Sequence, residues 1–175
     1  VVSEIGLDRI EGAPHFSLQE EIFRAQIQLA KDVDMPIIYH SRLANPEILD
    51  IMKDEQAFKV GGAAHYFQGD LKTAKKCIDL GFMISFAKPV LRIPELQEVA
   101  LKIPADSILL ETDCFPQPFK RKRSAWTEPR HLAEIAECVA EIRGINVDLL
   151  IEQTSNNLLS LLGNRANNVK SLISQ

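Results

Sequence analysis

The sequence predicts an α/β fold built around a parallel β-sheet. Short apolar runs alternate with longer segments of helical periodicity, and no linker or low-complexity segment divides them. The runs are mostly apolar throughout rather than alternating, which is typical of parallel strands buried on both faces. With 175 residues, 46% of them hydrophobic and 25% charged, the chain can form one sizeable core. We therefore expect a single domain over residues 1–175.

Five segments are expected to form strands, and a helix is expected after each of them. The strand segments are 1–8, 35–40, 58–67, 82–87 and 107–113. After the first strand, Ser17 followed by Glu20 predicts a capping box that opens a helix. The 3.6-residue spacing of apolar residues predicts the buried face of this helix, made of Leu18, Ile22, Ala25 and Leu29.

Each later helix has a start or stop signal of its own. Asn45, Asp70 and Asn146 have side chains of the type that caps a helix N-terminus. Gly144 is expected to end the helix before it, because glycine readily adopts the left-handed conformation found after helix ends. The expected helical segments are 45–53, 70–81, 94–102, 129–143 and a last region that starts at 146.

Composition limits the classes of function. A net charge of −4 argues against a generally basic nucleic-acid surface, so positive charge at a phosphate site would be local or come from a metal ion. Neither GxGxxG nor GxxxxGK[ST] occurs, which disfavours a Rossmann or P-loop nucleotide site. The apolar runs are too short to span a membrane, no signal peptide is recognisable, and three widely spaced cysteines form no disulfide framework. We expect a cytoplasmic protein without a membrane partner.

Four side chains that can bind divalent ions fall near the ends of predicted strands. They are Glu4, His40, His65 and Asp113. In parallel α/β folds the functional residues collect at the C-terminal ends of the strands, so these four should converge. Two imidazoles and two carboxylates suit Zn²⁺, Mn²⁺ or a similar ion, which would lower the pKa of a bound water and polarise a substrate oxygen. The pattern predicts a hydrolytic metal site in which Asp113 faces the metal and the attacking water.

Each of these residues also has a simpler interpretation. A single His after an apolar strand is more often a hydrogen-bonded core or loop residue, and Glu4 could pair with a nearby cation. The segment 111–113 could be a helix-capping turn. The basic run 120–123 is usually a solvated loop, although after the fifth strand it could contact phosphate. The coincidence of four candidate ligands at four strands favours the metal site.

Several motifs resemble, in order and spacing, those of the TatD-type metal-dependent hydrolases and deoxyribonucleases. They are SEIGLD (3–8), IIYHSR (37–42), AAHYF (63–67), GFMISFAKPV (81–90), LLETDCF (109–115) and TSNNLLSLLG (154–163). The resemblance covers essentially the whole chain. It implies a TIM-type (β/α)8 barrel with five C-terminal βα units present. It also implies hydrolysis of phosphodiesters, typically of DNA, at one or two divalent ions, with Zn, Mg and Mn as the candidates.

The resemblance also implies roles for individual residues. Glu4 would bridge the metal ions, and both Glu4 and Asp113 would be catalytic. His40 and His65 would bind one ion, and Asp113 would bind the other and assist the attacking water. The implied substrate-binding positions are Arg42 and His131.

The sequence departs from the family pattern in several places. Ser3, Tyr66 and Thr127 stand where Gly, Cys and Asn are usual, and the His-x-His pair of the family's first strand does not occur. A complete barrel would need about 250–280 residues, so we expect the first three strands to be missing and the flanking strands to expose unpaired edges. Two alternatives remain: a metal-dependent amidohydrolase or esterase acting on a small molecule, and a non-catalytic barrel fragment.

Overall fold

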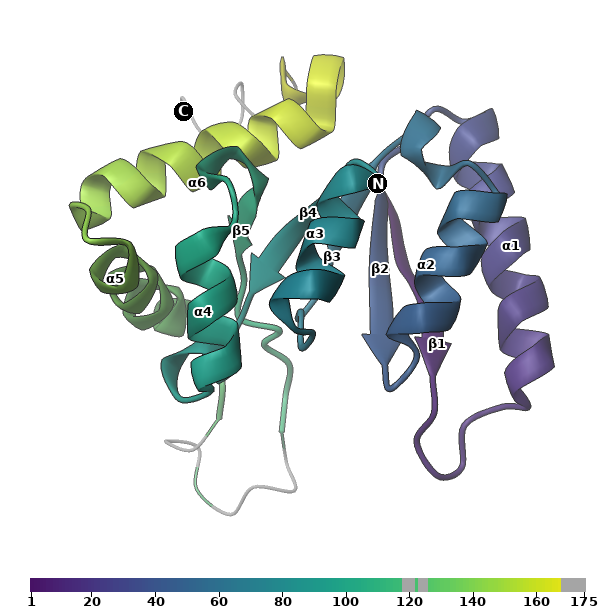
Figure 1. The fold of residues 1–175 in the computed structure, drawn as a ribbon, viewed down its shortest axis with the longest axis horizontal. Coiled ribbons are helices and arrows are strands. Elements are labelled where there is room, and N and C mark those ends of the chain that lie inside the picture. Colours follow the sequence, from purple (N-terminus) through teal and green to yellow (C-terminus); the bar gives the residue numbers. More distant parts are fainter. Residues whose placement is uncertain (118–121, 123–125, 168–175) are drawn as a thin grey trace.

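The centre of the molecule is a sheet of five parallel strands (Figure 1). The structure, a computed structural model, describes residues 1–117, 122 and 126–167. The strands are β1 (Val2–Asp8), β2 (Ile37–Arg42), β3 (Gly62–Ala64), β4 (Phe82–Phe86) and β5 (Ile108–Leu110). They lie in the order β1-β2-β3-β4-β5, so each strand pairs with the next one along the chain. This arrangement confirms the predicted parallel α/β fold.

Six α-helices lie among the described residues. They are α1 (Phe16–Asp32), α2 (Asn45–Asp54), α3 (Leu71–Asp79), α4 (Pro94–Lys102), α5 (Leu132–Arg143) and α6 (Val147–Leu162). Every crossover steps to the next strand in the same direction, so right-handed connections put α1 to α4 on one face of the sheet. The last helix, α6, lies above α4 and α5 in Figure 1. Asn157 of α6 donates hydrogen bonds of 2.8 Å to the carbonyl oxygens of Ala105 and Ile108, at the start of β5.

The core lies between the sheet and its helices. Its largest fully buried side chains come from both layers and include Tyr39, Phe23, Phe82, Phe86, Leu7, Ile27 and Ile84. Burial of each such side chain contributes about 1.5–3 kcal/mol, which makes this layer the main source of stability. No helix in the described part of the chain combines the length and apolar character needed to cross a membrane.

Helix α1 buries a different face from the one predicted. It packs on β1 and buries Phe23, Ile27 and Ala30. The residues predicted to be buried are exposed: Leu18, Ile22, Ala25 and Leu29. The helix has two rows of apolar residues. The 3.6-residue spacing of apolar residues indicates that such a row exists, but it does not identify which row packs against the sheet. The prediction of the buried face was therefore wrong.

The predicted helix caps were partly right. Asp70 and Asn146 each accept a hydrogen bond of 2.7 Å from a backbone N–H in the first turn of the following helix. Gly144 ends α5 with a φ of 65°. Two predictions were wrong: His15 stands at the N-cap of α1 without a side-chain hydrogen bond, so Ser17 caps nothing there. Asn45 is the first residue of α2 rather than its cap.

Two glycines allow neighbouring strands to approach closely. A Cβ atom on Gly62 would lie 1.8 Å from the carbonyl oxygen of Ile37, and one on Gly6 would lie 1.9 Å from that of His40. Any side chain would clash there, so only glycine fits. Beside Gly6, the register of β1 on β2 shifts between Val2 and Ile5. Such a bulge re-aims side chains, and here it contains Glu4.

Candidate metal centre

Glu4, His65 and Asp113 form a cluster on the sheet. One ligand atom of each, a carboxylate oxygen or an imidazole nitrogen, lies within 4.8 Å of those of the other two. His65 directly follows β3 and Asp113 comes soon after β5, as predicted. Glu4 lies inside β1 rather than at its end. The bulge in that strand contains Glu4 and sets the direction of its side chain. Three residues distant in sequence are thus brought together by three strands.

Glu111 orients the imidazole of His65. An oxygen of Glu111 lies 2.7 Å from His65 Nδ1, and its other oxygen accepts a hydrogen bond from the backbone N–H of Tyr66. Because an ionised carboxylate can only accept, Nδ1 carries the proton and Nε2 is left for the cluster. His65 Nε2 lies 3.1 Å from Glu4 Oε1 and 3.8 Å from Asp113 Oδ1. A carboxylate on the second nitrogen is a common feature of histidine metal ligands.

The electrostatics of the cluster favour a cation. Burial lowers the pKa of His65, but the hydrogen bond to Glu111 and the charges of Glu111, Glu4 and Asp113 outweigh it and raise the pKa above its ordinary value. Three carboxylates therefore surround one imidazole. Carboxylate oxygen and imidazole nitrogen are also the donors that zinc and manganese accept. The donor set fits one divalent ion.

Backbone conformation also marks the site. Tyr66 has a φ of 45° and Asp113 a φ of 48°, values that residues other than glycine rarely adopt. Each lies where the chain has just left a strand, next to or within the cluster. Unfavourable conformations of this kind collect at functional sites, where the surrounding structure enforces them.

His40 lies beside the cluster, but Asp8 binds its ring. His40 Nε2 is 2.8 Å from Asp8 Oδ2, and the centres of the His40 and His65 rings are 6.5 Å apart. Asp8 also pairs with Arg42 at 3.5 Å. Burial raises the pKa of Asp8, but the backbone N–H of Ile10, His40 and Arg42 together bring it below its ordinary value. This contact between Asp8 and His40 was not predicted from the sequence.

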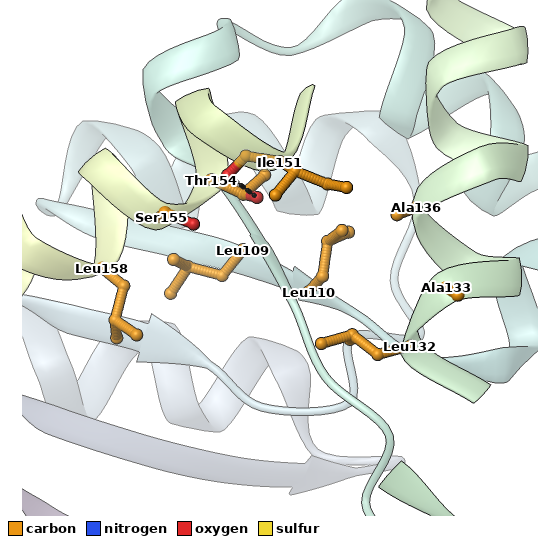
Figure 2. Close-up of a pocket in the computed structure, with 9 residues that line it drawn as sticks. All are labelled: Leu109, Leu110, Leu132, Ala133, Ala136, Ile151, Thr154, Ser155 and Leu158. Atoms are coloured by element: carbon orange, nitrogen blue, oxygen red, sulfur yellow. Dashed lines mark hydrogen bonds between the residues drawn. The ribbon is translucent and has the colours of Figure 1, made fainter. Parts of the chain in front are cut away.

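The three cluster residues, His40 and Arg42 line a single cavity of about 380 Å³. Its lining consists of Glu4, His40, Ser41, Arg42, Leu43, His65, Tyr66, Gln68 and Asp113. All predicted site residues except His131 therefore meet in one place. A separate cavity of about 290 Å³ lies between β5, α5 and α6, and Figure 2 shows its lining of leucine, isoleucine, alanine, serine and threonine. It has no ionisable side chain and offers no means of hydrolysis.

His131 and the basic run lie elsewhere. His131 Nδ1 accepts a hydrogen bond of 2.8 Å from the backbone N–H of Glu128, and the Glu128 side chain completes a capping box at the 3₁₀ turn Pro129–His131. The structure thus gives His131 a capping contact. Of the basic run, Lys120, Arg121 and Arg123 lie outside the described residues, and Lys122 is exposed.

Glu111 is the site residue that the sequence analysis treated only as part of a turn. The sequence did contain a signal, because Glu111 and Asp113 are two residues apart at the end of the segment that was predicted to be a strand, 107–113. In such a segment, alternate side chains point to the same side. A carboxylate on the same side as a predicted metal ligand is a natural candidate for a supporting contact.

Comparisons with known proteins agree with this geometry. The family model described as "TatD related DNase" matches residues 1–163. The Bacillus subtilis protein named "Uncharacterized metal-dependent hydrolase YabD" is 37% identical over 161 residues, which make up 89% of this chain and 62% of that protein. The Klebsiella pneumoniae protein named "3'-5' ssDNA/RNA exonuclease TatD" is 34% identical over 175 residues, or 96% of this chain and 66% of that protein.

A solved structure extends the similarity to the fold. The crystal structure of YJJV, a TATD homolog from Escherichia coli K12, matches with a TM-score of 0.82 at 30% identity, over 91% of this chain and 62% of that one. The predicted TIM-type barrel is thereby confirmed as the fold class, and the five strands form part of it. The chain spans less than two thirds of the length of each of these relatives.

Proposed function

Because the chain belongs to the TatD-related DNase family, we propose that it forms part of a divalent-metal-dependent hydrolase that cleaves phosphodiester bonds of DNA. The observation that carries this proposal is the cluster of Glu4, His65 and Asp113, with ligand atoms within 4.8 Å of one another. The names of the relatives support metal-dependent hydrolysis and, for one of them, a nucleic-acid substrate.

In this proposal Glu4, His65 and Asp113 hold a divalent ion. Such an ion polarises a phosphoryl oxygen and lowers the pKa of a bound water. Glu111 keeps the proton of His65 on Nδ1, so that the Nε2 lone pair faces the cluster. The Asp113 side chain is 41% exposed and reaches the cavity, where its carboxylate can accept the proton of the attacking water.

Arg42 supplies positive charge that the overall composition lacks. Its side chain is half exposed, lines the same cavity and is 3.5 Å from Asp8. A guanidinium presents two parallel donors to a phosphate, which fixes the orientation of the substrate as well as binding it. We assign Arg42 to the phosphate of the scissile bond. His40 could join as a further ligand after its Nε2 leaves Asp8, or through its other ring nitrogen.

Replacement of Glu4 tests the proposal. Wild type, Glu4→Ala and the control Glu21→Ala, an exposed position on α1, would be incubated with a single-stranded DNA oligonucleotide and Mn²⁺. We expect wild type and control to cleave it, and chelation of the metal to stop the reaction. Glu4→Ala should be slower by about a hundredfold or more, as when one electrostatic contact to a transition state is removed.

Three outcomes would contradict the proposal. Cleavage by Glu4→Ala at the wild-type rate would exclude the cluster as its source. Hydrolysis of amides or lactones from a small-molecule panel, with DNA untouched, would favour the amidohydrolase alternative. A chain that leaves every substrate intact would favour the non-catalytic fragment.

A further inference from the structure

A third cavity, of about 420 Å³, lies in the segment that follows β5. Its lining includes Cys114, Phe115, Pro116, Trp126, Glu128 and Arg130. Cys114 directly follows Asp113, so the cavity begins where the proposed metal ligands end. Its volume is within the range of about 300–1,000 Å³ that small-ligand sites occupy. None of these residues has a role in the proposed hydrolysis.

Two aromatic rings dominate this cavity. Phe115 is 49% exposed, whereas Phe23, Phe82 and Phe86 are at most 1% exposed in the core. Trp126 is half-buried and is the only tryptophan in the chain. An exposed ring contributes less to folding than a buried one, because less of its apolar surface leaves water. Aromatic faces beside a site that handles nucleic acid are instead the usual platform for bases.

Arg130 adds positive charge at the edge of the cavity. Its side chain is 72% exposed and pairs with Glu128 at 2.8 Å. A guanidinium plane can stack on a base and can also bind a phosphate oxygen, so it serves a nucleotide in either orientation. A sugar phosphate without a base has no flat ring to stack on the aromatic side chains, and an apolar side chain of a peptide would gain nothing from the cation.

We propose that this cavity binds a nucleobase of the strand undergoing hydrolysis, stacked on Phe115 and Trp126. The inference rests on the proposed phosphodiesterase function, since a phosphodiester held at Glu4, His65 and Asp113 brings a neighbouring base toward the segment after Asp113. Every base has a flat π-face, so stacking favours nucleic acid over simple phosphoesters without selecting a sequence. The substrate class is therefore a nucleic-acid strand with an unpaired base at the site.

Trp126 permits a direct test. Because the chain has one tryptophan, emission excited at a wavelength that its two tyrosines do not absorb reports this cavity alone. The chain would be titrated with thymidine 5′-monophosphate and, separately, with deoxyribose 5-phosphate, which lacks the base. We expect the nucleotide to quench the emission saturably and the sugar phosphate to leave it unchanged at the same concentrations.

Variants of Phe115 separate stacking from other effects. Phe115→Ala should weaken nucleotide binding by about tenfold, within the range for loss of one base–aromatic contact. Phe115→Tyr keeps the ring and should bind as wild type does. Phe58→Ala is the matched control, because Phe58 is 52% exposed and lies before β3, outside the lining of this cavity. Thermal unfolding of each variant checks that the fold is intact.

The outcomes distinguish the base site from the proposed function. Equal quenching by both ligands, or unchanged nucleotide binding in Phe115→Ala, would overturn the base site even where DNA hydrolysis depends on Glu4. Base-dependent quenching that Phe115→Ala weakens would support the site. That support would stand even if hydrolysis proved independent of Glu4, a result that contradicts the metal-dependent function alone.

Discussion

At the scale of single residues, the orientation of His65 depends on Glu111. The carboxylate binds both the ring Nδ1 and the backbone N–H of Tyr66, so it fixes the ring relative to its own strand. With Nδ1 bound to Glu111, the Nε2 atom faces Glu4 and Asp113. Glu111 is a positioning residue, since its contacts are with His65 and Tyr66 rather than with the ligand atoms of the cluster.

Glu111→Gln should weaken metal binding without unfolding the protein. The amide keeps the size of the side chain but loses the charge that holds the imidazole proton, and loss of such a partner typically costs about 10–100-fold in metal affinity. Competition titration with a chromogenic zinc chelator measures the affinity. Glu98→Gln, which removes an exposed ion pair with Lys102 on α4, should bind zinc as wild type does. An unchanged affinity in Glu111→Gln would contradict the assigned role.

Residue types and strand order predicted that Glu4, His40, His65 and Asp113 would converge, because the functional residues of parallel strands lie at one edge of the sheet. The ligand atoms of Glu4, His65 and Asp113 do lie within 4.8 Å of one another, whereas the His40 ring contacts Asp8. The contact between Asp8 and His40 could not be predicted. It depends on the register of β1 on β2, in which Gly6 pairs with His40, and a sequence does not report register.

At the scale of elements, the N-cap of α3 contributes stability that depends on pH. Hydrogen bonds from Thr73 lower the pKa of Asp70 below its ordinary 3.8. A lowered folded-state pKa means that the cap stabilises the protein above about pH 4, and that this contribution is lost as the pH falls through the folded-state pKa. The stabilisation is thus fully present at neutral pH and absent in strong acid.

Asp70→Ala should therefore lower the free energy of unfolding by about 1 kcal/mol at pH 7, the usual cost of a lost cap. The difference from wild type should shrink toward zero in strong acid. Urea unfolding at several pH values measures it. Asp70→Asn retains a capping oxygen that does not titrate, so it should match wild type at pH 7 and keep its cap in acid. Equal stability of wild type and Asp70→Ala at pH 7 would rule out this contribution.

The existence and order of the elements were predictable, but their limits were not. The segment 58–67 was expected to be one strand, yet only Gly62–Ala64 is extended and a 3₁₀ turn occupies Ala57–Lys59. Gly61, with a φ of 61°, separates the turn from the strand. The segment 129–143 likewise begins as a 3₁₀ turn before α5. Such limits depend on local backbone geometry that apolar patterns do not encode.

At the scale of the whole molecule, the described sheet has two open edges, β1 and β5. Apolar side chains are exposed near both. On α1 and directly after it they include Leu18, Ile22, Leu29 and Val33, each about half exposed. Around the cavity in Figure 2 they include Leu132, Ile151 and Leu158. This agrees with the expectation of unpaired edges in a chain that spans 62% of the length of a relative such as YabD.

The three ligands assigned to the proposed metal centre nevertheless come from this part of the barrel. Its ligands come from β1 and from the segments after β3 and β5, and Glu111 supports it from within the same chain. We therefore expect the five βα units to bind a divalent ion by themselves.

This expectation can be tested by equilibrium dialysis against Zn²⁺. Wild type, His65→Ala and the control His15→Ala, which removes an exposed histidine outside the cluster, would be compared at neutral pH. We expect one bound ion per chain in wild type and in the control, and none at the same zinc concentration in His65→Ala. Equal zinc binding by all three proteins, or no binding by wild type, would contradict it.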